Sequence, residues 1–135
     1  MLHLSSRLPF SIDDVYGGFA QVTGILTAEE DAIFLEYQTQ DNILGGLIKS
    51  STRELMIPLQ ELDSVEARSK WTGTRFFIRV RRLASLDGLP NVENGEVKLK
   101  IKRKNKEVAI SMASRINLRI SELRLDPSER GDSFL

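Results

Sequence analysis

The sequence predicts a mainly β (α+β) domain, in which six or seven antiparallel strands form a barrel or sandwich capped by one C-terminal α-helix. Hydrophobic residues recur with period two through most of the chain, and the period changes to that of a helix after residue 105. The length of 135 residues, with 41% hydrophobic and 28% charged residues, suits one globular domain. No linker divides it, so we expect an N-terminal arm or edge strand over 1–15, the domain over 16–125 and a flexible tail over 126–135.

The strands are predicted from alternation. Residues 18–27 and 32–39 flank an acidic turn at 28–31 and should form a hairpin. Four further strands are predicted at 54–59, 64–70, 74–82 and 96–103. The last two alternate most clearly, with apolar residues on one face and mostly Arg or Lys on the other. A seventh strand would come from residues 1–15 or 43–51, or it would be absent.

The helix is predicted over residues 106–124, where apolar residues recur with helical spacing. One apolar stripe contains Ala109, Met112, Ala113, Ile116, Ile120 and Leu123. Asn105 is suited to cap its start, and Pro127 limits its end. At 1.5 Å per residue this helix extends about 28 Å, enough to cover the open side of a small sheet or barrel.

The junction between two predicted strands resembles that of a known family. Residues 57–65, IPLQELDSV, are similar to the "I-P-L, two residues, aliphatic, one residue, S/T-V" junction of bacterial pleckstrin-homology-like (PH-like) domains. The resemblance covers residues 18–124 and implies a seven-stranded barrel, with Pro58 at a strand end and Leu62 at the barrel mouth. Eukaryotic domains of this fold often bind phosphoinositides through a basic loop between the first two strands. That loop is AEED here, and its carboxylates would repel a phosphate, so we do not transfer the site.

The chain lacks most residues that common catalytic mechanisms need. It has no Cys, His3 is its only His, and the patterns GxSxG, GxxxxGK[ST] and GxGxxG do not occur. Acidic pairs such as Asp13 and Asp14 fall in predicted turns, where solvent would keep them ordinary carboxylates. A Ca²⁺ site at 29–31 would lack the spacing of an EF-hand loop. We therefore expect no enzyme, no cofactor and no metal site.

Charge is unevenly distributed although the 19 basic and 19 acidic residues cancel. The net charge is −7 over residues 1–69, +8 over 70–106 and −1 over 107–135. Alternation places five cations on one outward face of the last hairpin, the candidate basic binding face: Arg79, Arg81, Lys98, Lys100 and Lys102. Such a face either attracts an anionic partner or only keeps an exposed sheet soluble, which is the simpler interpretation. Nucleic acid is the least favoured partner, because Phe77 is the only aromatic residue among these cations.

Two apolar features are candidate contacts. Ile43, Leu44, Leu47 and Ile48 lie in a loop or short strand, which is either exposed or buried in the fold or in a homo-oligomer interface. Trp71 lies in the turn 69–73 beside Lys70. Its indole either packs over the end of the barrel, which we prefer, or anchors a membrane or partner.

These patterns favour a non-catalytic binding or scaffolding module for a protein partner, including a second copy of the chain. The alternative is peripheral binding to anionic membrane lipids through the basic hairpin face, with Trp71 at the interface. The sequence has no apolar run near the roughly 20 residues that span a bilayer, and its start does not resemble a secretory signal. We expect a cytoplasmic protein, located at the inner membrane face in the alternative.

Overall fold

The computed structural model describes residues 7–41, 48–49 and 51–125, and it confirms a mainly β fold with one C-terminal helix. The strands are β1 (Arg7–Val15), β2 (Ala20–Ala28), β3 (Ala32–Asp41), β4 (Ile48–Lys49), β5 (Arg53–Pro58), β6 (Leu62–Lys70), β7 (Gly73–Val80) and β8 (Glu96–Ile101). Helix α1 spans Lys106–Leu125, and short 3₁₀ turns include η1 (Tyr16–Gly18), η2 (Leu59–Glu61), η3 (Leu83–Leu86) and η4 (Arg103–Asn105). All six strands predicted within the domain are present, with shifted ends.

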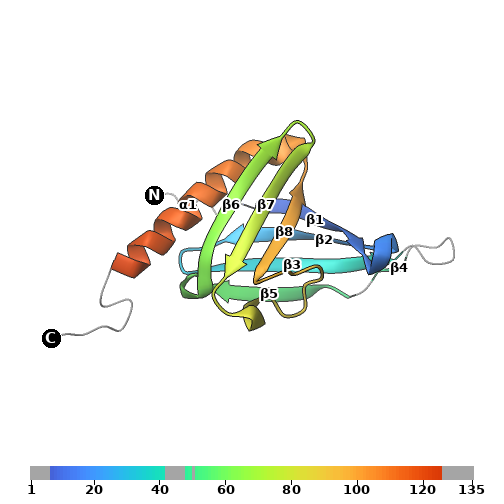
Figure 1. The fold of residues 1–135 in the computed structure, drawn as a ribbon, viewed down its shortest axis with the longest axis horizontal. Helices are drawn as coiled ribbons and strands as arrows, with labels where there is room; N and C mark the ends of the chain where they lie inside the picture. Colours follow the sequence, from blue (N-terminus) through green and yellow to red (C-terminus); the bar gives the residue numbers. More distant parts are fainter. Residues whose placement is uncertain (1–6, 42–47, 50, 126–135) are drawn as a thin grey trace.

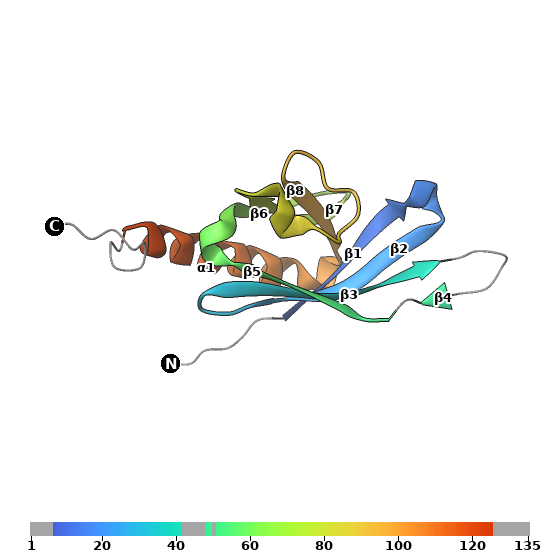
Figure 2. The same cartoon turned by 90° about the horizontal axis from the view of Figure 1, so that it is seen from below.

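The strands form one antiparallel sheet in the order β4-β3-β2-β1-β8-β7-β6, and β5 also pairs with β3. Two meanders, β1 to β5 and β6 to β8, meet where Ser11 of β1 pairs with Lys100 of β8. Among the described strands, the two ends of this sheet are not paired with each other, so the sandwich is open on one side. Figures 1 and 2 show the two meanders as two layers, with α1 along the open side.

The N-terminal segment differs from the expected arm or edge strand. β1 pairs with β2 on one side and β8 on the other, so it is an interior strand and supplies the missing element of the sheet. Its alternate side chains Leu8, Phe10 and Ile12 are buried. Local alternation signals a strand, but only pairing with a distant segment makes that strand interior. The predicted tail, 126–135, lies outside the described residues.

Helix α1 covers the unpaired edge of β6. The six residues of the predicted apolar stripe are all buried: Ala109, Met112, Ala113, Ile116, Ile120 and Leu123. Beside this stripe, the side-chain amide of Asn117 bonds both backbone groups of Val65: Nδ2 donates to the carbonyl at 2.7 Å, and Oδ1 accepts from the N–H at 3.1 Å. Farther along, Arg124 donates to the carbonyl of Leu62 at 3.3 Å. Side chains of the helix thus take the place of a neighbouring strand.

In the other layer, the backbone of β2 and a side chain of β1 approach each other closely at Gly24. Gly24 of β2 lies opposite Phe10 of β1, and the phenyl ring packs over the glycine. A Cβ at Gly24 would collide with the carbonyl oxygen of Glu36 and lie 2.8 Å from Cζ of Phe10. Only glycine leaves room for this ring, which lies in the core.

We expect Asn117→Ala to lower the free energy of unfolding by about 1–3 kcal/mol, because it leaves the N–H and carbonyl of Val65 without partners in a part-buried position. Urea denaturation measures this change. Ser114→Ala, on the exposed face of the same helix, is the control and should change stability by less than about 0.5 kcal/mol. Equal stability of the two variants would contradict the role given to Asn117.

Candidate functional site

Three of the five residues of the predicted basic face lie on the paired strands of the hairpin, and the other two lie beyond the strand ends. Lys98 and Lys100 lie on the outward face of β8. Arg79 is bound to Glu96, with 3.1 Å between Nη2 and Oε2. Arg81 lies beyond the end of β7, and Lys102 lies beyond the end of β8. The strands end earlier than predicted, so Arg81 and Lys102 lie outside the regular hairpin.

A row of three cations crosses the outward face instead. Arg68 of β6 lies opposite Arg75 of β7, which lies opposite Lys100 of β8. Alternation already placed Arg75 on this face, but the candidate set omitted it. Arg68 is not among the five candidates either, and its signal in the sequence is its position on the outward side of a predicted strand. The row itself appears only when the register of three strands is known.

The outer cations of the row have carboxylate partners, and the middle one does not. Arg68 binds Glu66 at 2.9 Å, and its guanidinium lies 4.5 Å from the centre of the Phe77 ring. Lys100 binds Asp13 of β1, with 3.1 Å between Nζ and Oδ2. The half-buried Arg75 donates only to the carbonyl of Thr74, at 3.1 Å. Among the described residues, Arg75 therefore has no hydrogen-bonded carboxylate.

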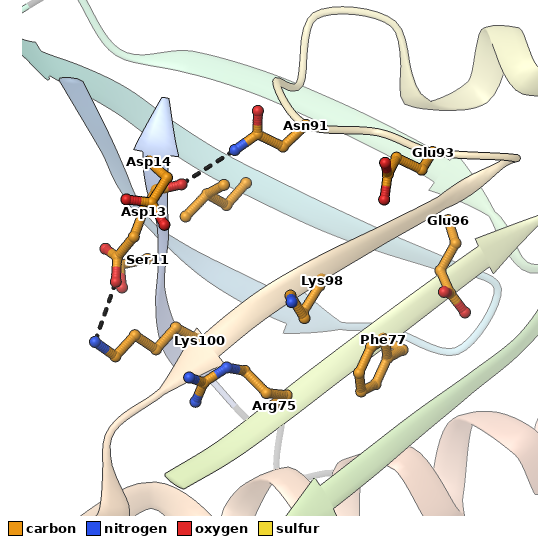
Figure 3. Close-up of a pocket in the computed structure, with 11 residues that line it drawn as sticks. Ser11, Asp13, Asp14, Arg75, Phe77, Asn91, Glu93, Glu96, Lys98 and Lys100 are labelled. Atoms are coloured by element: carbon orange, nitrogen blue, oxygen red, sulfur yellow. Dashed lines mark hydrogen bonds and ion pairs between the residues drawn. The ribbon is translucent and has the colours of Figure 1, made fainter. Parts of the chain in front are cut away.

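A cavity of about 450 Å³ opens beside this row (Figure 3). Its lining residues come from β1, β7, β8 and the loop before β8: Ser11, Ile12, Asp13, Asp14, Arg75, Phe77, Asn91, Glu93, Glu96, Lys98 and Lys100. It exists because β1 leaves β8 after the pairing of Ser11 with Lys100, and its register with β2 breaks between Ile12 and Val15.

The wall of the cavity contains two residues in the left-handed region. Asp14 and Asn91 both have φ of 58°, an unusual value for residues other than glycine. The side-chain amide of Asn91 donates to the carbonyl of Asp13 at 3.0 Å, which ties the loop to the end of β1. Backbone strain of this kind collects at binding sites, where the surrounding structure holds it in place.

Asp13 carries a charge that the site stabilises. Its Oδ1 accepts a hydrogen bond from Gln21 at 2.8 Å, and its Oδ2 accepts one from Lys100. These bonds lower the pKa of Asp13 below its ordinary value, with smaller contributions from the charges of Lys100 and Arg75, while partial burial opposes them. The carboxylate of Asp13 is therefore ionised at neutral pH and contributes a negative charge to the cavity.

Trp71 occupies an exposed position at the β6–β7 turn, which corrects the preferred expectation that it packs over the barrel end. Its side chain is 89% exposed. Arg103 of η4 donates to its carbonyl at 3.4 Å, which places the turn beside the start of α1 (Figure 1). We call this end of the molecule the basic tip, and its exposed members are Lys70, Trp71, Lys102, Arg103 and Lys104.

The apolar segment of the sequence analysis is mostly outside the described residues. Ile43, Leu44 and Leu47 fall there, and Ile48 is described only as part of the backbone of β4. His3 also lies outside. Within the described ranges, no group of three or more His, Cys, Asp or Glu side chains could hold a metal ion, and no helix is long and apolar enough to cross a membrane.

Comparisons of this chain with family models, curated proteins and solved structures found no match. The basic tip and the cavity are the two candidate sites in the described part of the chain.

The pKa of Asp13 makes a small part of the stability depend on pH. Because this pKa is lower in the folded chain than in the unfolded chain, the carboxylate stabilises the fold above the unfolded pKa, and this contribution is lost as the pH falls through the folded value. Asp13→Asn should be less stable than the wild type at about pH 7, and the two should converge at about pH 2. Its side chain is 37% exposed, so we expect a difference below about 1 kcal/mol.

Urea denaturation at several pH values measures this effect. Asp87→Asn, which removes an exposed carboxylate outside the cavity lining, is the matched control and should show no convergence of this kind. A stability difference for Asp13→Asn that does not change with pH would contradict the assignment.

Proposed function

We propose that this chain is a non-catalytic binding module that docks on anionic membrane surfaces through the basic tip. The exposure of Trp71 among cations carries the proposal, because an indole has an apolar body and a polar N–H and settles at the boundary between lipid and water. The segments 69–74 and 101–106 contain five Lys or Arg residues and no Asp or Glu. Each such cation gains about 1 kcal/mol near an anionic leaflet.

The two features of the tip act together. A basic cluster alone binds weakly and is screened by salt, and one inserted side chain alone gives marginal binding. Their combination at the turn supplies both a hydrophobic and an electrostatic contribution. A role in solubility accounts for the cations but not for the indole, because a polar residue would serve a solvated turn better.

The arrangement of strands supports a further proposal, membership of the PH-like fold that the sequence resembles. Two antiparallel meanders meet at β1 and β8, and the C-terminal helix lies at the open side. The junction residues behave as the resemblance implies: Pro58 ends β5 and Leu62, which is buried, begins β6. In this proposal the protein is cytoplasmic and docks at the inner face of the membrane.

Vesicle sedimentation tests the proposed docking. The wild type should bind vesicles of phosphatidylcholine with phosphatidylserine, and it should bind pure phosphatidylcholine far less. Trp71→Ala should weaken binding at least about tenfold, since inserting a large apolar side chain is worth about 1.5–3 kcal/mol. Raising the salt concentration should also weaken it.

Phe19→Ala is the matched control, since Phe19 is 66% exposed but lies at the β1–β2 turn, away from the tip. It should bind vesicles like the wild type. Binding that ignores lipid charge and salt, or that Trp71→Ala leaves unchanged, would overturn the proposal. A tip that instead binds an acidic protein surface would give no vesicle binding at all.

A protein partner, specifically a second copy of the chain, is the second candidate. One observation favours it: Ile110, Leu118 and Leu125 are exposed on the outer face of α1, and the residues between them include Ser111, Ser114 and Ser121. A helix face of apolar and small side chains with few charges packs readily against another like it. This candidate uses a surface separate from the basic tip.

Sedimentation velocity over a range of protein concentrations tests self-association. The wild type should sediment faster as the concentration rises, and Leu118→Glu should abolish this change, because it would bury a charge in the contact. Leu83→Glu, another exposed leucine, lies on η3 and should behave like the wild type. A single monomeric species at every concentration would contradict a helix-mediated dimer.

A further inference from the structure

The three-cation row and the cavity beside it have no part in the docking surface proposed above. We propose that this cavity binds a compact oxyanion, a phosphate group or phosphate monoester, with Arg75 as its principal ligand. The inference does not rest on membrane docking, and it would stand if the basic tip bound nothing.

The charge arrangement is the first argument. Like charges directly opposite each other on neighbouring strands destabilise a sheet, and here two such pairs share one residue, Arg75. Glu66 and Asp13 form ion pairs with the outer cations Arg68 and Lys100. The middle cation, Arg75, is attracted by the charge of Asp13, but its hydrogen-bond acceptor is the carbonyl of Thr74. An unfavourable arrangement of this kind is expected at functional sites, where a ligand offsets it.

A second cation faces the same space. Lys98 lies on β8 and lines the cavity, and it has no hydrogen bond or ion pair among the described residues. Figure 3 shows Arg75, Lys98 and Lys100 rising from the two strands on one side of the cavity. A guanidinium offers parallel N–H donors that match two oxygens of a phosphate, and lysines add charge at close range. Arg75, Lys98 and Lys100 together could contact one oxyanion.

Four carboxylates in the lining limit what the ligand can be. Asp13 and Asp14 lie at the end of β1, and Glu93 and Glu96 lie toward the start of β8 (Figure 3). Asp13 is already bound to Lys100 and Glu96 to Arg79. Carboxylates there would repel further negative charge on the body of a ligand. The flat ring of Phe77 also lines the cavity and offers an apolar contact. We therefore expect one phosphate on a neutral or cationic body.

The phosphate has two possible sources. The row lies two residue pairs from the β6–β7 turn, since Lys70 pairs with Gly73, Ser69 with Thr74 and Arg68 with Arg75. A lipid headgroup could therefore reach it when the tip lies on a membrane, and a phosphate in solution could reach it at any time. The chemistry at Arg75 is the same in both cases.

Titration of the ¹⁵N-labelled full chain with inorganic phosphate at low ionic strength tests the site. We expect saturable shifts of the backbone amides of Arg75, Lys98 and Lys100. Arg75→Gln should weaken binding about tenfold or more, the equivalent of one charge-assisted hydrogen bond. Arg81→Gln removes the same charge outside the cavity and should leave binding unchanged. Shifts that do not saturate, or equal losses in both variants, would overturn the proposal.

Thermal unfolding separates a binding role from a structural one. Without phosphate, Arg75→Gln should unfold at the same or a higher temperature than the wild type, because it removes two like-charge pairs. Phosphate should raise the unfolding temperature of the wild type above that in chloride of equal ionic strength, and it should not do so for Arg75→Gln. A lower unfolding temperature of the variant in chloride would mean that Arg75 serves the fold, and it would overturn the site.

Vesicles containing phosphatidic acid distinguish the two sources. If Arg75→Gln loses both phosphate binding and vesicle binding, the site takes a lipid headgroup. If it loses phosphate binding alone, the site takes a phosphate from solution. Trp71→Ala should keep phosphate binding in either case, so a failure of membrane docking and a failure of the cavity site give different results.

Discussion

The fold depends on how the open edge of β6 is closed. A sheet that bends back on itself without closing leaves one strand with unpaired backbone groups, and such an edge invites pairing with another chain. Here α1 covers the edge, and the amide of Asn117 bonds both the N–H and the carbonyl of Val65 as a neighbouring strand would. The apolar stripe supplies the bulk of the packing, and Asn117 and Arg124 together tie the helix to the backbone of the strand.

The two meanders are joined less extensively where β1 meets β8, and the cavity lies at this junction. β1 and β8 pair at Ser11 and Lys100 only, so the meanders separate beyond that point. The salt bridge from Lys100 to Asp13 and the bond from Asn91 to the carbonyl of Asp13 fasten the two sides of the gap. Charged residues and residues with positive φ line this gap because β1 and β8 are no longer paired there. Regular pairing of the two strands would leave no room for these side chains.

The sequence predicted what local patterns determine. Alternation located the strands and helical spacing located α1, because both patterns report which side of an element faces the core. The sequence does not reveal that Trp71 is exposed, since a turn residue is buried only if a distant part of the chain covers it. The role of Asn117 was invisible for a related reason: a polar residue beside an apolar stripe reveals nothing of the strand that it meets.

The candidate site was predicted only in part for the same reason. Strand alternation gave the outward direction of Lys98 and Lys100 correctly, but the five-residue face assumed strands longer than β7 and β8 are. The row of Arg68, Arg75 and Lys100 requires the register between three strands, and that register is a property of the assembled sheet. Segment charge indicated that the middle of the chain is basic, and folding decided which of its cations face one another.

The position of α1 also fixes a distance. The helix starts next to the basic tip and has 20 residues, so at 1.5 Å per residue its last turn, at Leu125, lies up to about 30 Å from its first. Figure 1 shows it running away from the β6–β7 turn. If the module docks on a bilayer through that turn, the C-terminal end of α1 lies in the aqueous phase. The helix would then act as a rigid spacer between the lipid surface and the chain that follows Leu125.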